Sequence, residues 1–206
     1  MALEWILITA AVVAALAMAP WRTLANPGLR GPWLACLVLL PLLWVAERAL
    51  PGGMVLQMSG AALLVLMFGW PLAVLTLLPI SAAGAWLGSH TSQQALALLA
   101  WNGIVAASLA LVLGVAVRRW LPHHVFVFIL GRGFIGTALA LMGASAASSV
   151  VLPLPPGTDL QTLLLGQWLM AWGEAFATGM LTAIFVAFKP QWLASWSDRR
   201  YLGPEI

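Results

Sequence analysis

The chain has 206 residues, of which 63% are hydrophobic and only 7% are charged, and its formal charge is +3. A soluble domain carries roughly a quarter charged residues, so this composition excludes a water-soluble globular protein and predicts an integral membrane protein. The nine basic residues are spread along the chain without forming a patch, which argues against a nucleic-acid-binding protein. A single cysteine, Cys36, excludes an intramolecular disulfide and a cysteine-rich metal cage.

A helix needs roughly 20 apolar residues to cross the hydrocarbon core of a membrane. By that measure the sequence predicts an all-α, polytopic membrane protein with about seven spans, forming a single transmembrane domain over residues 1–206. The predicted spans are residues 2–19, 33–50, 54–70, 71–88, 95–117, 124–150 and 160–188. We interpret the first as a retained span, because Glu4 stands where a signal peptide would carry basic residues.

Turn-forming residues separate these spans. The motifs, in chain order, are Asn26-Pro27-Gly28 with Gly31-Pro32, Pro51-Gly52-Gly53, Gly69-Trp70-Pro71, the polar connector of residues 89–94, and the proline-rich residues 153–158. Proline removes a backbone donor and disfavours helix in the residue before it, so each proline-containing motif predicts a break. The connector of residues 89–94 predicts a break through its polar composition. Thr158 or Asp159 is placed to cap the last helix.

The basic residues predict the orientation in the membrane. If the N-terminus is outside, nearly all of them become cytoplasmic: Arg22, Arg30, Arg118, Arg119, Lys189, Arg199 and Arg200. Only Arg48 then lies outside, and the opposite orientation reverses this bias. Cytoplasmic loops carry the excess of arginine and lysine. We therefore expect an N-out, C-in protein of the cell inner membrane.

Polar groups inside a membrane are costly, and each is a functional hypothesis by default. Glu174 is the deepest acid of the predicted spans, and Gln167 lies two turns before it on the same face of the last span. Two interpretations of Glu174 stay open. It is either a functional group, as a proton or cation site or as an orienter of a ligand-binding group, or a structural carboxyl that is protonated or bonded to a neighbouring helix. Arg132, flanked by Gly131 and Gly133, is a candidate structural or coupling residue that either pairs with Glu174 or reaches the cytoplasmic interface.

The remaining candidates for substrate binding lie in the third and fifth spans. Met54, Gln57 and Met58 cluster within one turn near the outer surface. Asn102 lies within the fifth span, where an interhelical hydrogen bond is the more common role for an asparagine. His123 and His124 fall at the cytoplasmic interface and are not expected to bind metal.

Several motifs resemble the cobalt/nickel substrate-capture permeases of energy-coupling-factor ABC transporters, the CbiM-like family. The similar segments are Pro51-Gly52-Gly53, Ser59-Gly60-Ala61-Ala62-Leu63, Gly69-Trp70, Asn102-Gly103, Gly173-Glu174-Ala175 with Thr178, and the tail from Lys189 to Leu202. The resemblance is to a divergent bacterial branch and covers most of the chain. It implies a seven-helix substrate-binding subunit beside a transmembrane coupling subunit and cytoplasmic ATPases.

The resemblance also implies a metal site that this sequence does not supply. Metal-carrying members use an N-terminal amine with a following histidine, and a second histidine after the Pro-Gly-Gly motif. Here the chain starts Met1-Ala2-Leu3-Glu4, and Gln57 and Gln167 stand where histidines are expected. Amides are weak ligands for nickel and cobalt, whereas imidazole is a good one. Whether any metal is bound stays open.

Two functions follow as hypotheses. The first is the substrate-capture permease of an energy-coupling-factor importer, which takes its energy from separate ATPase subunits because this sequence has no Walker motif. The alternative is a membrane scaffold or assembly factor that keeps the fold without the site. We expect no cofactor. The sequence also lacks a His-Glu-x-x-His motif and a nucleophile beside Glu174, so we do not expect an enzyme.

Overall fold

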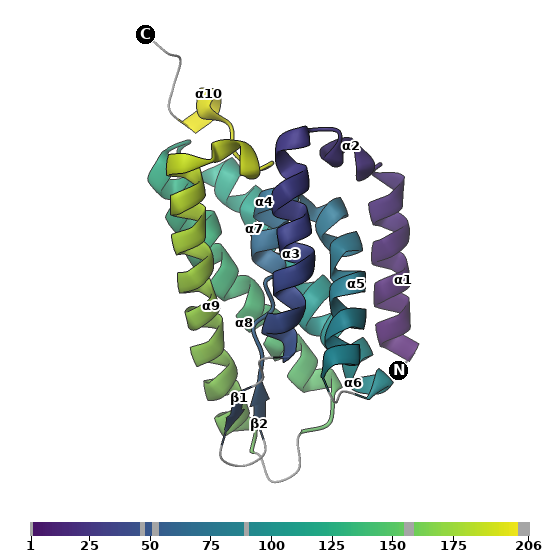
Figure 1. Ribbon diagram of the computed structural model, residues 1–206. Coiled ribbons are helices and arrows are strands. Elements are labelled where there is room, and N and C mark those ends of the chain that lie inside the picture. Colours follow the sequence, from purple (N-terminus) through teal and green to yellow (C-terminus); the bar gives the residue numbers. More distant parts are fainter. Residues whose placement is uncertain (1, 46–47, 51–53, 89–90, 155–158, 202–206) are drawn as a thin grey trace.

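The computed structural model describes residues 2–45, 48–50, 54–88, 91–154 and 159–201, and these form a bundle of helices along one common axis (Figure 1). The α-helices are α1 (Ala2–Ala17), α2 (Trp21–Leu24), α3 (Pro27–Val45), α4 (Ala61–Phe68), α5 (Trp70–Leu87), α6 (Ser92–Ala97), α7 (Ala106–Trp120), α8 (Gly136–Val151), α9 (Leu160–Phe188) and α10 (Asp198–Tyr201). Two π-helical segments, η1 (Leu98–Val105) and η2 (Val127–Ile135), lead into α7 and α8, and a 3-10 turn, η3 (Pro190–Trp192), follows α9.

One short hairpin interrupts the helices. Strand β1 (Arg48–Leu50) pairs antiparallel with β2 (Met54–Leu56), with Ala49 opposite Val55. The hairpin lies at the end of the bundle where α9 begins, and α10 lies at the opposite end (Figure 1). The motif Pro51-Gly52-Gly53, which joins the strands, lies outside the described residues.

Among the described residues, five helical stretches are long and apolar enough to cross a membrane: Pro27–Val45, Trp70–Leu87, Ser92–Trp120, Val127–Val151 and Leu160–Phe188. The apolar helix α1 is shorter, at 16 residues. Large apolar side chains point away from the bundle, and Ile6, Val38 and Phe176 are each more than 60% exposed. Such a surface is stable in lipid and not in water, so the chain is a multi-pass membrane protein.

The second predicted span, residues 33–50, is wrong at both ends. Helix α3 already begins at Pro27 and ends at Val45, and residues 48–50 are strand β1. Proline suits the first helical position because its missing N–H would have no partner there. The Oδ1 atom of Asn26 accepts a hydrogen bond from the Gly28 N–H at 3.0 Å. The motif that predicted a loop therefore starts a helix, and Gly31-Pro32 lies inside it.

The third predicted span, residues 54–70, is wrong over most of its first half. Residues 54–56 are strand β2, residues 57–60 have no regular structure, and only Ala61–Phe68 is helical. Gly60 explains where the helix begins, because its φ of +69° is left-handed and cannot continue an α-helix. Gly69, with a φ of +77°, separates α4 from α5 and confirms the predicted turn there.

Helix α4 occupies the middle of the bundle. It packs against α3, α5, α7 and α9 and against both π-helical segments. Every residue of α4 except Leu63 is buried. A buried helix of eight residues cannot use water to satisfy its terminal backbone groups, so other parts of the chain must supply the partners.

Replacing Gly60 with alanine tests the left-handed turn that starts α4. An added Cβ at Gly60 would lie 2.6 Å from Leu40 Cδ2, on a backbone that L-residues rarely adopt. We expect G60A to lower the free energy of unfolding by about 2–4 kcal/mol, measured by denaturant titration in mixed micelles. The control is G173A in α9, where an added Cβ meets nothing within 4 Å. Equal stability of the two variants would contradict this account of α4.

Candidate functional site

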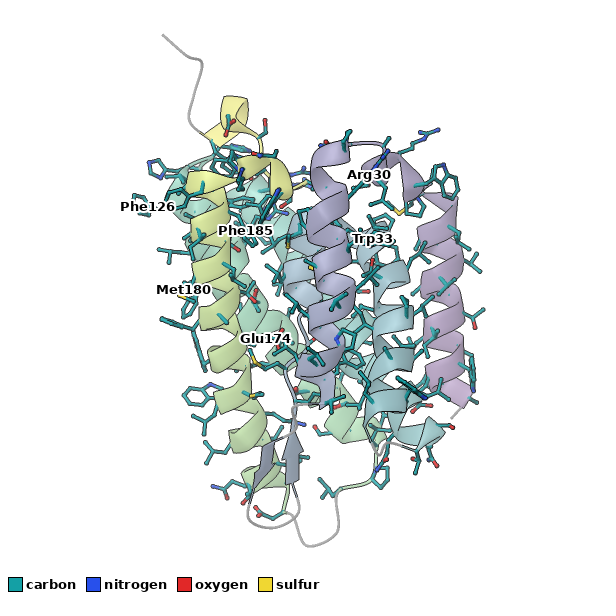
Figure 2. All side chains as sticks on the ribbon, viewed as in Figure 1. Arg30, Trp33, Phe126, Glu174, Met180 and Phe185 are labelled. Carbon is teal, nitrogen blue, oxygen red and sulfur yellow. The ribbon has the colours of Figure 1, made fainter. Side chains whose placement is uncertain are left out.

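The segment of residues 57–60 runs through the bundle interior without regular structure, and Glu174 of α9 satisfies its backbone. The Ser59 N–H donates to Glu174 Oε2 at 2.5 Å, and the Gly60 N–H donates to Glu174 Oε1 at 2.8 Å. Figure 2 shows Glu174 at mid-height, on the side of α9 that faces the rest of the bundle. Its side chain is only 3% exposed. The sequence separation of 115 residues makes this contact a tie between distant parts of the chain.

Charge and helix geometry favour this arrangement. The N-terminus of a helix carries partial positive charge and unpaired N–H groups, so it is a natural partner for a carboxylate. Hydrogen bonds between a backbone N–H and an ionised acceptor are shorter and stronger than neutral ones. Because both oxygens of Glu174 are engaged by backbone donors, the geometry favours the structural interpretation of this acid over an open ion site.

Ser59 completes the turn with three further hydrogen bonds. Its Oγ donates to the carbonyl oxygen of Asn102 and accepts from the Ala61 N–H at 3.2 Å. Its carbonyl oxygen accepts from Trp44 Nε1 at 2.9 Å. Ser59 is fully buried, so every one of these partners replaces water.

Asn102 joins the network through its backbone rather than its amide. It lies in π-helical segment η1, where the Ala106 N–H donates to the carbonyls of Trp101 and Gly103. The Asn102 carbonyl accepts instead from the Ser59 hydroxyl. Irregular turns of this kind are frequent at functional sites. The contact that Asn102 makes is therefore one between its backbone carbonyl and the irregular segment, which differs from the predicted interhelical hydrogen bond.

Gln57 lies beside this turn and also contacts α3. Its Nε2 donates to the backbone carbonyl of Trp44, whose side chain is only 2% exposed. Trp44 therefore binds both residues: its backbone carbonyl accepts from Gln57, and its indole Nε1 donates to the Ser59 carbonyl. The neighbouring Met58 is half-buried, and for Met54 the structure describes only its backbone, in β2.

Gln167 is the candidate with unused hydrogen-bonding capacity. It is half-buried on α9, two turns before Glu174, and its Oε1 atom is buried without a partner in the described part of the chain. The same holds for Nε1 of Trp172, which packs against Phe134 with ring centroids 5.4 Å apart. Buried polar atoms without partners are uncommon and require an explanation.

Arg132 lies near the other end of α4. Its Nη1 donates to the carbonyl of Ser195 at 3.5 Å, and its guanidinium lies 5.2 Å from the ring centroid of Phe128. Gly114 makes room for it, because an added Cβ there would come within 3.1 Å of the guanidinium nitrogens. These contacts give Arg132 a local structural role at the end of the bundle that carries most of the basic residues.

The structure thus brings together Gln57, Asn102 and Glu174, and it places Arg132 elsewhere. Sequence reasoning did not predict Ser59, Gly60 or Trp44 as site residues, although Ser59-Gly60 belonged to the motif that resembles the permease family. A serine and a glycine ahead of an apolar run are an ordinary helix start. Nothing local indicated that their amides meet an acid from α9.

Two further features bear on ligands. No group of three or more potential metal ligands among His, Cys, Asp and Glu occurs within the described residues. At the end opposite the hairpin, a groove of about 650 Å³ separates α2 and α3 from the C-terminal segment. Its lining is Arg22, Thr23, Asn26, Leu29, Pro190, Gln191, Leu193, Ala194, Trp196, Ser197 and Asp198.

Comparison with known proteins gives no relative: no family model, no curated protein and no solved structure matches the chain.

Replacing Glu174 with glutamine tests the carboxylate cap. An amide has one acceptor oxygen where the carboxylate has two, so either the Ser59 or the Gly60 N–H then faces an NH₂ group. We expect E174Q to lose about 1–3 kcal/mol of unfolding free energy while still inserting into the membrane. The matched control is D159N at the exposed start of α9, where Asp159 Oδ2 accepts from the Thr162 N–H. Asparagine caps helices as well as aspartate does, so a loss in D159N as large as that in E174Q would contradict the interpretation.

Proposed function

We propose that this protein is the substrate-capture component of an energy-coupling-factor type importer. One observation supports this most directly: at mid-bundle an irregular segment, residues 57–60, leads into the buried eight-residue helix α4. Transporters commonly form their binding sites from discontinuous helices, and irregular backbone at membrane depth is tolerated only inside protein or along a cavity. The motifs that resemble the CbiM-like permeases include this segment.

The proposal includes seven membrane crossings. The five long helices, the shorter α1, and α4 with its irregular lead-in make up this number. The N-terminal end of α1 would be outside and the basic residues of α2, α7 and the end of α9, such as Arg22, Arg118 and Lys189, would be cytoplasmic. That places the hairpin and the start of α9 at the outer face of the inner membrane.

Substrate would then enter from the hairpin end of the bundle. The candidate residues there, Gln57, Met58 and Gln167, offer amide and thioether groups. These are poor ligands for nickel or cobalt and better partners for a small cofactor precursor or a soft ion. The Oε1 of Gln167, which has no partner among the residues that the structure describes, is the atom most ready to receive a donor from the substrate.

The energy for uptake would come from other subunits. The sequence holds no Walker motif, so we propose a transmembrane coupling subunit and cytoplasmic ATPases as partners. The experiment is to purify the tagged chain from its native membrane and identify what accompanies it. Co-purification of an ATPase, with uptake that stops when that ATPase is deleted, supports the proposal. A chain that purifies alone, with uptake independent of any ATPase, rejects it.

A membrane scaffold is the second candidate, and one observation favours it. Both oxygens of Glu174 are already engaged by backbone N–H groups, so the deepest acid serves the fold. A stable complex with another membrane protein, without a bound small molecule, would support the scaffold.

Replacing Gln167 with alanine tests whether this residue belongs to the proposed binding site. If Gln167 binds substrate, Q167A loses one hydrogen bond, and the Kd of the molecule that co-purifies with the wild type rises about tenfold. Stability stays unchanged, because the amide oxygen has no partner in the described part of the chain. Gln161, exposed on the first turn of the same helix, supplies the control Q161A. Unchanged affinity in Q167A would remove Gln167 from the site.

A further inference from the structure

After α9 the chain turns back across the end of the bundle. Residues 189–201, which include η3 and α10, form a segment that we name the strap. The strap lies at the end of the bundle opposite the hairpin, close to α2 and the start of α3 (Figure 1). None of the sequence patterns predicted a structural role for it.

The strap binds the C-terminal end of α4 through its backbone. The Ala194 N–H donates to the Met67 carbonyl at 2.8 Å. The Ser195 N–H and Oγ both donate to the Leu66 carbonyl, at 3.3 and 2.7 Å. The last carbonyls of a helix have no partner within the helix. In α4 these groups are buried, so the strap supplies hydrogen bonds that water cannot.

Side chains hold the strap in this position. The Trp196 and Tyr201 rings stack at 4.7 Å, and both pack edge-on against Phe128 of η2, at 4.9 and 5.1 Å. Leu193 and Tyr201 are 2% and 6% exposed. Arg132 donates to the carbonyl of Ser195, the residue that binds α4. The strap is therefore docked by apolar burial and by a cation next to the negative end of the α4 dipole.

Helix α4 is thus held at both ends by distant segments. Glu174 binds the Ser59 and Gly60 amides just before the first residue of α4, and the strap binds the carbonyls at its C-terminal end. Eight residues span roughly 12 Å, and a helix this short has little stability of its own. Releasing either end leaves buried backbone groups unpaired, which loosens the whole helix rather than one turn of it.

We propose that the strap is a latch on α4, and that its release at the strap end of the bundle frees the Ser59 and Gly60 amides from Glu174. The latch links the two ends of the bundle through one buried helix. This mechanism concerns the chain itself and holds whether the protein is a transporter or a scaffold.

Hydrogen exchange of the full chain in lipid nanodiscs tests the latch. The variant is S195A, which removes the hydroxyl that donates to Leu66. Losing one hydrogen bond of about 1 kcal/mol raises the opening equilibrium about fivefold, and we expect exchange to quicken by that factor at Ser59 and Gly60 as well as along α4. S195T keeps a hydroxyl and should exchange as the wild type does. S197A is the matched control, because Ser197 is an exposed strap residue.

The location of the faster exchange decides whether the latch proposal stands. Faster exchange confined to the strap and the last turn of α4, with Ser59 and Gly60 unchanged, would show that the two ends move independently. Equal acceleration in S197A would equally reject it. Neither outcome bears on uptake or on co-purified subunits, so the latch and the proposed function fail separately.

Discussion

The fold depends on one interaction: the carboxylate of Glu174 receives the two successive backbone N–H groups of Ser59 and Gly60. A helix that begins in the middle of a membrane protein exposes polar backbone where no water is available, and each unpaired group there costs several kcal/mol. A side chain from its own sequence neighbourhood could cap such a helix. Here an acid from α9 does so, and the same contact that satisfies the backbone fixes the position of α9 relative to α4.

The packing around α4 follows from that constraint. The bonds of Ser59 and Trp44 draw η1 and α3 onto the same turn, and Gly60 adopts its left-handed conformation close to Leu40, where a Cβ would not fit. At the opposite end the strap supplies the donors that α4 lacks. The charges agree with the helix dipole, since an acid lies at the positive end and Arg132 next to the strap at the negative end. Helix α4 is consequently stabilised mainly by contacts with other parts of the chain.

The sequence predicted the membrane class and most helices, because long apolar runs are a strong and local signal. The last predicted span, residues 160–188, matches α9 at both ends, and Glu174, which the sequence singled out, is buried on it. The predictions failed where tertiary contacts determine the local structure. Hydropathy cannot distinguish an apolar helix from an apolar strand over three residues, so β1 and β2 were assigned to spans. Ser59 and the strap residue Ser195 each bind a partner more than 100 residues away, and no local sequence pattern indicates these contacts.

The most direct test of the central claim is the proximity of the Gly60 amide to a glutamate carboxyl, measured by solid-state NMR in bilayers. Ser59-Gly60 is the only Ser-Gly pair in the chain, so ¹³C-carbonyl serine combined with ¹⁵N-glycine isolates that one amide. When glutamate carries ¹³C at its side-chain carboxyl, the dipolar coupling to that carbon should dephase the Gly60 nitrogen signal, as it does for a directly hydrogen-bonded pair. In E174Q made with unlabelled glutamine this dephasing should be absent. A Gly60 nitrogen that shows no dephasing in the wild-type protein would contradict the account, because α4 would then begin without its acid.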